Sequence, residues 1–161
     1  MTTTALAIAT TNLTKVYRSG HQQTPVLRGV NLKIEYGHIH LSMGSSESGK
    51  TTLLSILAGI LAPTSGQVVV LGQEITQLSK AALAKFRLQN IGFVFQNFNL
   101  FPALTALENV EIALNLKSIK GQKAKEQAAD LLKAVVWAIA LTLRPPISPG
   151  VKNNGLLLPV P

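Results

Sequence analysis

The sequence predicts an α/β fold over residues 1–136, and three observations support this prediction. Segments rich in β-branched residues alternate with segments whose apolar residues recur at helical spacing. A loop rich in glycine and serine, residues 44–49, joins a predicted strand to a predicted helix. Hydrophobic residues make up 47% of the 161 residues and charged residues only 14%, so the chain has enough apolar surface to form a core.

The sequence of the first half of the chain predicts three strands, followed by one helix and a further strand. A polar segment, residues 18–24, predicts a turn between the first two strands. Apolar residues at helical spacing follow the glycine-rich loop, and residues 63–66 read as a turn. The expected elements are strands over 6–17, 26–34 and 38–43, a helix over 49–61, and a strand over 67–71.

The second half predicts mainly helices, and then an irregular tail. Ser79 is a suitable N-cap for the first of these helices. The expected elements are helices over 79–88, 105–116 and 123–136, and one buried strand over 91–95. Residues 137–161 contain no acidic residue and most of the prolines, and dense proline blocks both helix interiors and central strands. We therefore expect a folded part over 1–136 and an irregular, disordered tail over 137–161.

The composition excludes several classes of function. The chain has no cysteine, which excludes disulfides, zinc–thiolate sites and a cysteine nucleophile. Asp130 is the only aspartate, which excludes any mechanism that needs two. The net charge of +8 suits anionic partners, but the basic residues are spread along the chain, so we expect no nucleic-acid partner. No apolar run approaches the roughly 18–20 residues of a membrane span, and the N-terminus makes a poor signal peptide, so we expect a cytoplasmic location.

The loop between strand and helix carries the clearest functional signal. Gly44, Gly49, Lys50 and Thr51 match the Walker A pattern G-x-x-x-x-G-K-[ST]. Such a loop points backbone N–H groups at an anion, and the helix that follows adds its partial positive charge. Lys50 is expected to reach the β- and γ-phosphates of a nucleotide, and the Thr51 hydroxyl to hold Mg²⁺. The alternative is an ordinary strand-to-helix turn. The residues expected to bind the nucleotide are Gly44, Ser45, Ser46, Glu47, Ser48, Gly49, Lys50, Thr51 and Thr52.

Glu47 departs from the usual composition of such loops, many of which have glycine at this position. A carboxylate that faces the phosphates opposes their binding, because like charges repel in a partly dry site. A side chain also strains a backbone conformation that glycine tolerates. The alternative is that Glu47 points to solvent and has little effect, and the sequence leaves both interpretations open.

Three further stretches form a recognisable set with this loop. They are Leu-Thr-Lys-Val-Tyr at 13–17, Leu-Leu-Ser-Ile-Leu-Ala-Gly at 53–59 with Pro-Thr-Ser-Gly at 63–66, and Ile-Gly-Phe-Val-Phe-Gln at 91–96. With them, residues 1–136 resemble the ATP-binding subunits of ABC transporters. The resemblance implies that Tyr17 stacks on adenine and that Gln96 contacts Mg²⁺ and the attacking water. It also implies that the apolar Phe98, Leu100 and Phe101 face a membrane subunit.

The resemblance also implies cofactors and partners. The cofactors are ATP and Mg²⁺. The partners are a membrane permease, contacted through the Q-loop region around Gln96, and a second ATP-binding subunit in a homodimer. The protein then lies on the inner face of the plasma membrane through its permease. Residues 95–100 are most similar to members that export macrolides, release lipoproteins or export heterocyst glycolipids in cyanobacteria.

The family pattern is incomplete in this sequence. The Leu-Ser-Gly-Gly-Gln signature, the Asp-Glu pair of Walker B and a histidine after the loop are all missing. One codon choice for the family's Leu-Ser-Gly-Gly-Gln-Lys-Gln-Arg-Val-Ala-Ile-Ala-Arg-Ala, read one base later, gives residues 148–161 without a mismatch. We therefore expect residues 137–161 to be the signature region read out of frame.

Several interpretations of function stay open at this point. The family assignment predicts an ATPase subunit that couples ATP binding and hydrolysis to export. The missing residues favour a module that binds nucleotide without turnover, or a truncated product without function. A different P-loop enzyme, such as a kinase, is disfavoured by the stretches at 13–17 and 91–96.

Overall fold

The computed structural model describes residues 5–135, which form two compact units divided after Arg87. The tail predicted over residues 137–161 lies outside the described residues. Within residues 5–135, no helix is both long enough and apolar enough to cross a membrane.

The first unit is built on a long hairpin of β1 (Leu6–Ser19) and β2 (Gln22–Glu35). Ser19 pairs with Gln22, so the turn holds only Gly20 and His21 instead of the predicted residues 18–24. The residues at the hairpin tip are exposed and mostly polar. The sequence there therefore lacks the alternation of apolar and polar residues that indicates a half-buried strand. Their backbone groups nevertheless pair across the hairpin, so both strands extend further than predicted.

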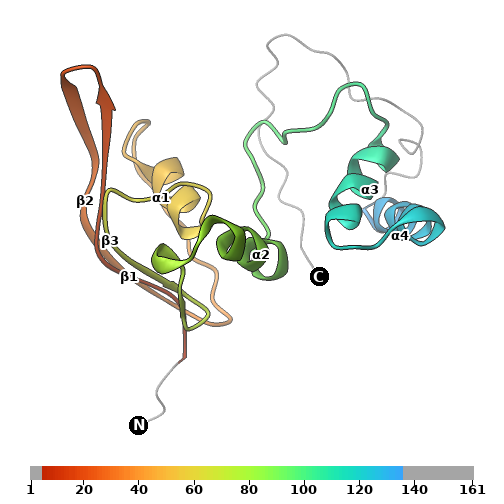
Figure 1. Cartoon of the computed structure of the whole chain (residues 1–161), viewed down its shortest axis with the longest axis horizontal. Helices are drawn as coiled ribbons and strands as arrows, with labels where there is room; N and C mark the ends of the chain where they lie inside the picture. Colours follow the sequence, from red (N-terminus) through yellow and green to blue (C-terminus); the bar gives the residue numbers. More distant parts are fainter. Residues whose placement is uncertain (1–4, 136–161) are drawn as a thin grey trace. The chain divides into compact units, whose positions relative to one another are not determined.

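Two more strands complete an antiparallel sheet with the order β2-β1-β3-β4. They are β3 (Ser65–Val70), close to the predicted 67–71, and the short β4 (Gln73–Glu74). Figure 1 shows α1 (Lys50–Leu57) beside this sheet. The largest fully buried side chains come from β1, α1 and β3, which places the core of the unit between sheet and helix. They are Leu13, Ile56, Val68 and Val70.

The remaining elements of the first unit are η1 (Ile75–Gln77) and α2 (Lys80–Asn90), whose last residues pass into the second unit. The Ser79 hydroxyl accepts a hydrogen bond from the Ala82 N–H at 3.2 Å, which confirms the predicted N-cap. The helix after the glycine-rich loop ends at Leu57 and not at Leu61 as predicted. Gly59 takes a φ of +66°, which ends the helix, and its carbonyl accepts a 2.7 Å hydrogen bond from Arg87.

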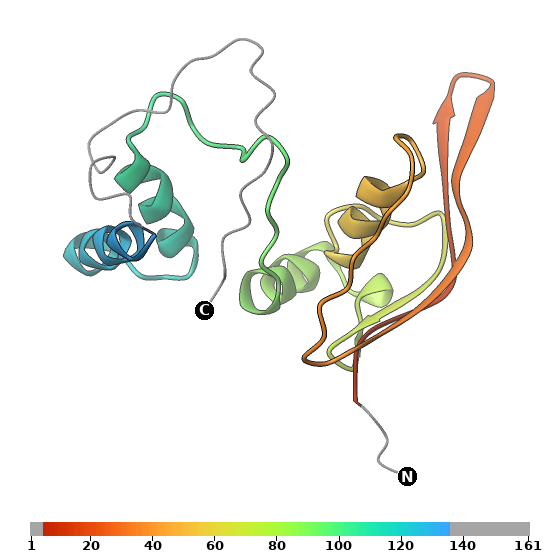
Figure 2. The ribbon, with the colours of Figure 1, turned by 180° about the vertical axis from the view of Figure 1, so that it is seen from behind.

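Two predicted strands, residues 38–43 and 91–95, are not strands in the structure. Figure 2 shows the first as an extended orange trace between β2 and α1. Ile39, Leu41 and Met43 are exposed by 101%, 80% and 82%. A strand buried on both faces needs neighbours for its backbone hydrogen bonds, and residues 5–135 supply none to either segment. Within the described residues, the antiparallel sheet is therefore the only sheet formed, and neither segment joins it.

The second unit contains a helical hairpin of α3 (Ala106–Leu116) and α4 (Gly121–Ala134). Thr105 and Glu108 form a reciprocal capping box, which fixes the start of α3 next to the predicted residue. Leu114, Ala124 and Ala128 form the buried core between the two helices, which lie side by side in Figures 1 and 2. Small alanine side chains on α4 let the two helices approach closely.

Candidate phosphate-binding loop

The loop between β2 and α1 has backbone conformations that few residues adopt. Glu47 has a φ of +69° and Gly49 a φ of +86°, both in the left-handed region. A Cβ atom at position 49 would lie 3.0 Å from Val26 Cγ1 and 3.2 Å from the Val26 carbonyl oxygen. Gly49 is therefore required for two reasons, its φ and its close approach to β2. This contact holds the start of α1 against the sheet.

The first turn of α1 has free backbone donors. Gly49 is the N-cap, and it has no side chain that accepts a hydrogen bond from the helix. The first intrahelical bond runs from the Leu53 N–H to the Gly49 carbonyl at 2.8 Å. The N–H groups of Lys50, Thr51 and Thr52 therefore have no partner within the helix. Together with the helix dipole, these groups make the end of α1 attractive to an anion.

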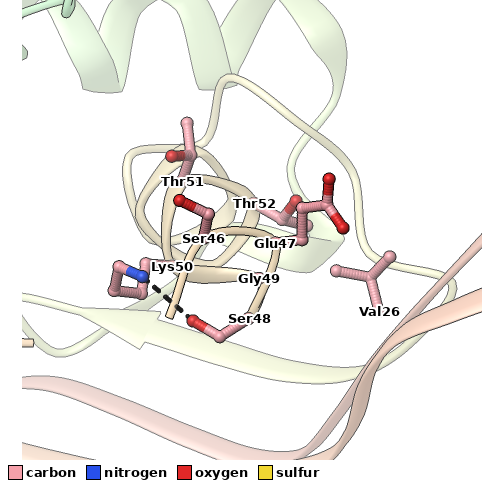
Figure 3. Close-up of a pocket in the computed structure, with 8 residues that line it drawn as sticks. All are labelled: Val26, Ser46, Glu47, Ser48, Gly49, Lys50, Thr51 and Thr52. Carbon is pink, nitrogen blue, oxygen red and sulfur yellow. Dashed lines mark hydrogen bonds between the residues drawn. The ribbon is translucent and has the colours of Figure 1, made fainter. Parts of the chain in front are cut away.

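Lys50 supplies a full positive charge at the same end of the helix. Its ammonium donates hydrogen bonds to the carbonyl oxygens of Gly44 and Ser45 at 2.7 and 2.6 Å, and interacts with the Ser48 hydroxyl at 3.0 Å (Figure 3). Within residues 5–135, no carboxylate forms an ion pair with Lys50. The loop thus holds the ammonium through neutral oxygen atoms, which leave its charge uncompensated.

A pocket of about 440 Å³ opens at this place, within the size range of small-molecule sites. It is lined by Val26, Ser46, Glu47, Ser48, Gly49, Lys50, Thr51 and Thr52. Figure 3 shows the Glu47 carboxylate on the side of Thr52 and Val26, away from the Lys50 ammonium. Seven of the nine loop residues predicted to bind nucleotide line the pocket, and Gly44 and Ser45 contribute through the carbonyls that hold Lys50. Val26 has no signal in the sequence, because it reads as an ordinary strand residue.

Tyr17 lies beside the same helix although it is far from it in sequence. Its hydroxyl is 3.5 Å from the Thr52 hydroxyl, and the residue as a whole is 44% exposed. The Lys15 ammonium lies 5.3 Å from the ring centroid and donates a 2.7 Å hydrogen bond to the Ala62 carbonyl. The structure therefore brings Tyr17 to the first turn of α1 and leaves part of its ring accessible.

Gln96 belongs to the second unit. It begins a turn over residues 96–99, and its side chain is exposed. The apolar residues predicted to face a membrane subunit follow it: Phe98, Leu100 and Phe101 are 40%, 50% and 55% exposed. The Asn109 amide holds this segment by accepting a 2.8 Å hydrogen bond from the Phe101 N–H and donating to the carbonyls of Phe101 and Leu104. Nothing in the sequence around Asn109 indicates this role.

The donor set around the loop suits a magnesium–phosphate complex better than a magnesium ion alone. Within the described residues, no group of three or more acidic or histidine side chains is arranged to hold a metal. Thr51 supplies one hydroxyl oxygen at the pocket wall. Mg²⁺ prefers octahedral oxygen coordination and is often bound by one or two protein groups plus substrate phosphates. The pocket fits that mode of binding.

The α/β fold and the Walker A loop at the start of α1 together define a P-loop protein. A family profile described as "ABC transporter" matches residues 27–144, and the chain belongs to that family. It is 43% identical over 113 residues to the ABC transporter ATP-binding protein YtrE of Bacillus subtilis, covering 70% of this chain and 49% of YtrE. It is also 43% identical over 134 residues to the lipoprotein-releasing system ATP-binding protein LolD of Geobacter metallireducens, covering 83% of this chain and 60% of LolD.

Solved structures agree with this assignment. The chain resembles a dimeric, post-hydrolysis structure of the ATP-binding cassette MJ0796 bound to ADP and Pi, with a TM-score of 0.80 and 37% identity. That match covers 86% of this chain and 61% of MJ0796. A second dimeric structure of MJ0796 gives a TM-score of 0.79 and 38% identity, covering 85% and 61%. The chain therefore spans about half to three fifths of the lengths of the proteins it matches.

Proposed function

We propose that this chain binds Mg-ATP at the loop 44–52 and serves as the nucleotide-binding part of an ABC export system. The observation that carries the proposal is the joint presence of unpaired first-turn N–H groups on α1 and an uncompensated Lys50 ammonium in one pocket. The triphosphate satisfies these donors, and Lys50 turns from the loop carbonyls to the β- and γ-phosphates. Thr51 supplies a hydroxyl ligand to Mg²⁺, which neutralises phosphate charge when bound.

The other site residues have roles in the same proposal. Tyr17 stacks on the adenine, which its exposed ring beside Thr52 supports. Gln96 contacts the Mg²⁺ and the attacking water in the assembled protein. The exposed apolar segment around Phe98, Leu100 and Phe101 contacts a membrane permease, through which the protein lies on the inner face of the plasma membrane. A second ATP-binding subunit completes the site, as the dimeric MJ0796 structures support.

A second proposal is that the 161-residue chain binds nucleotide without turning it over. Asp130 is its only aspartate, and the structure pairs it with Lys133 at 3.4 Å on the exposed surface of α4. The first unit, which carries the pocket, therefore contains no aspartate that could order a metal or polarise a water.

Nucleotide binding by the purified chain tests the first proposal. Replacing Lys50 by alanine is expected to abolish Mg-ATP binding measured by calorimetry, because the pocket loses its only full positive charge. Lys133→Ala is the matched control, because it removes the same charge from an exposed pair on α4. Equal affinity in the Lys50→Ala variant and the unmodified chain would show that the loop is not the binding site.

A further inference from the structure

Glu47 is the residue of the loop that neither the fold nor phosphate binding explains. Its φ of +69° lies in the left-handed region, which is unfavourable for a glutamate, and glycine adopts it freely. Its carboxylate has no hydrogen-bond or ion-pair partner within residues 5–135, so no contact there compensates for the strain. A strained, unpaired side chain in a binding pocket points to a role in binding.

The position of this carboxylate sets its effect on a ligand. Glu47 lines the same pocket as Lys50, but the two side chains point in different directions, and no ion pair joins them (Figure 3). The pocket therefore combines one positive and one negative charge at separate places. An incoming triphosphate meets the ammonium on one side and the carboxylate on the other. The repulsion from Glu47 rises with the negative charge of the ligand.

The two forms of ATP differ strongly in that charge. Free ATP carries roughly four negative charges at neutral pH, and roughly two when one Mg²⁺ is bound. The carboxylate therefore repels the free nucleotide more than the magnesium complex, and it attracts the metal where the metal comes near. A glycine at this position makes no such distinction.

We propose that Glu47 makes the loop selective for the magnesium complex of the nucleotide over the free nucleotide. This inference rests on the proposed nucleotide binding at the same loop. Glu47 then acts as a specificity-determining residue: it lowers the overall affinity and raises the dependence of binding on Mg²⁺.

The test compares two dissociation constants for each variant of the full chain, one with ATP and Mg²⁺ and one with ATP and EDTA. The dissociation constant with EDTA divided by the dissociation constant with Mg²⁺ measures selectivity for the magnesium complex, and a larger ratio means stronger selectivity. In Glu47→Gln, which keeps the side-chain length but removes the charge, the ratio is expected to fall about fivefold, mostly because free ATP binds more tightly. Glu111→Gln on α3, which removes an equal charge outside the loop, is the control and is expected to leave the ratio unchanged.

A third variant separates charge from backbone strain. Glu47→Gly removes both, so it is expected to show the same fall in the ratio as Glu47→Gln and, in addition, a higher melting temperature without nucleotide. Equal ratios in the unmodified chain and Glu47→Gln, with binding still dependent on Lys50, would overturn the inference and leave the proposed function intact. If Lys50→Ala does not weaken nucleotide binding in the unmodified chain or in either Glu47 variant, both the inference and the proposed function are wrong.

Discussion

At the scale of single residues, Tyr17 is the side chain whose role depends most on the fold. The β1–β2 hairpin carries its ring to the first turn of α1, where the Tyr17 and Thr52 hydroxyls are 3.5 Å apart. That distance is too long for a strong hydrogen bond, so the hydroxyl contributes little to the position of the ring. The exposed face of the ring is the part available to a base, and stacking on a base is worth about 1–3 kcal/mol.

Replacing Tyr17 therefore has an effect that depends on the substitution and on the ligand. Tyr17→Ala is expected to weaken ATP binding about tenfold, because the stacking surface is lost, while Tyr17→Phe is expected to bind as the unmodified chain does. Tripolyphosphate, which has no base, is the control ligand and is expected to bind all three equally. Calorimetric titration measures both ligands. An equal loss of tripolyphosphate binding in Tyr17→Ala would mean that the residue supports the loop and does not stack on adenine.

At the scale of elements, the close approach of β3 to β1 depends on one glycine, Gly66. Gly66 has a φ of +93°, and a Cβ atom there would lie 2.5 Å from the Asn12 carbonyl oxygen and 2.6 Å from Leu13 Cα. These are backbone atoms, which cannot rotate away as a side chain does. Gly66→Ala is therefore expected to lower the free energy of unfolding by about 3 kcal/mol, through clash and strained φ together.

Gly72→Ala is the matched control for this prediction. Gly72 has a similar φ of +77°, but a Cβ atom there meets nothing within 4 Å. Its substitution is expected to cost only about 1 kcal/mol, from backbone strain alone. Urea unfolding of both variants measures the difference. Equal losses would show that the β1–β3 contact does not make Gly66 indispensable.

The elements also show which parts of the fold the sequence predicts. The existence of each helix and the Ser79 N-cap were predicted correctly, because helical spacing and a cap act within a few turns of chain, although the helix predicted over 49–61 ends at Leu57. The strands over 38–43 and 91–95 were wrong, because strand formation depends on neighbours from elsewhere, and apolar residues alone do not supply them.

The same distinction applies to the candidate site. The loop from Gly44 to Thr51 was found from its local spacing, and the structure places it at the start of a helix as expected. Val26 and Asn109 were missed, because each acts through contacts with residues distant along the chain or with backbone atoms that carry no sequence signal. The strained φ of Glu47 follows from the conformation of the whole loop, and the sequence left open whether a side chain there is unfavourable or has little effect.

At the scale of the whole molecule, binding and hydrolysis of ATP make different demands. In the proposed function, binding uses the loop, Lys50 and Tyr17, all of which belong to the first unit. Hydrolysis in the family additionally needs a carboxylate pair and a signature sequence, and the 161-residue sequence contains neither. We propose that residues 137–161 are the signature region read out of frame. In place of the signature they have Ser148, Pro149 and Gly150, and proline lacks a backbone donor.

The last prediction is therefore that the 161-residue chain releases no phosphate above a buffer blank at saturating Mg-ATP, even where binding is measured. Losing a single preorganised donor already costs about 10²–10³ in rate, and here several groups are missing together. The Lys50→Ala variant controls for contaminating ATPases, and a chain with its frame shifted back after residue 136 and extended through the family's carboxylate pair is expected to gain activity. Turnover of about 1 per second that disappears in Lys50→Ala would show that the chain is a complete enzyme, and that residues 137–161 supply what the family signature supplies elsewhere.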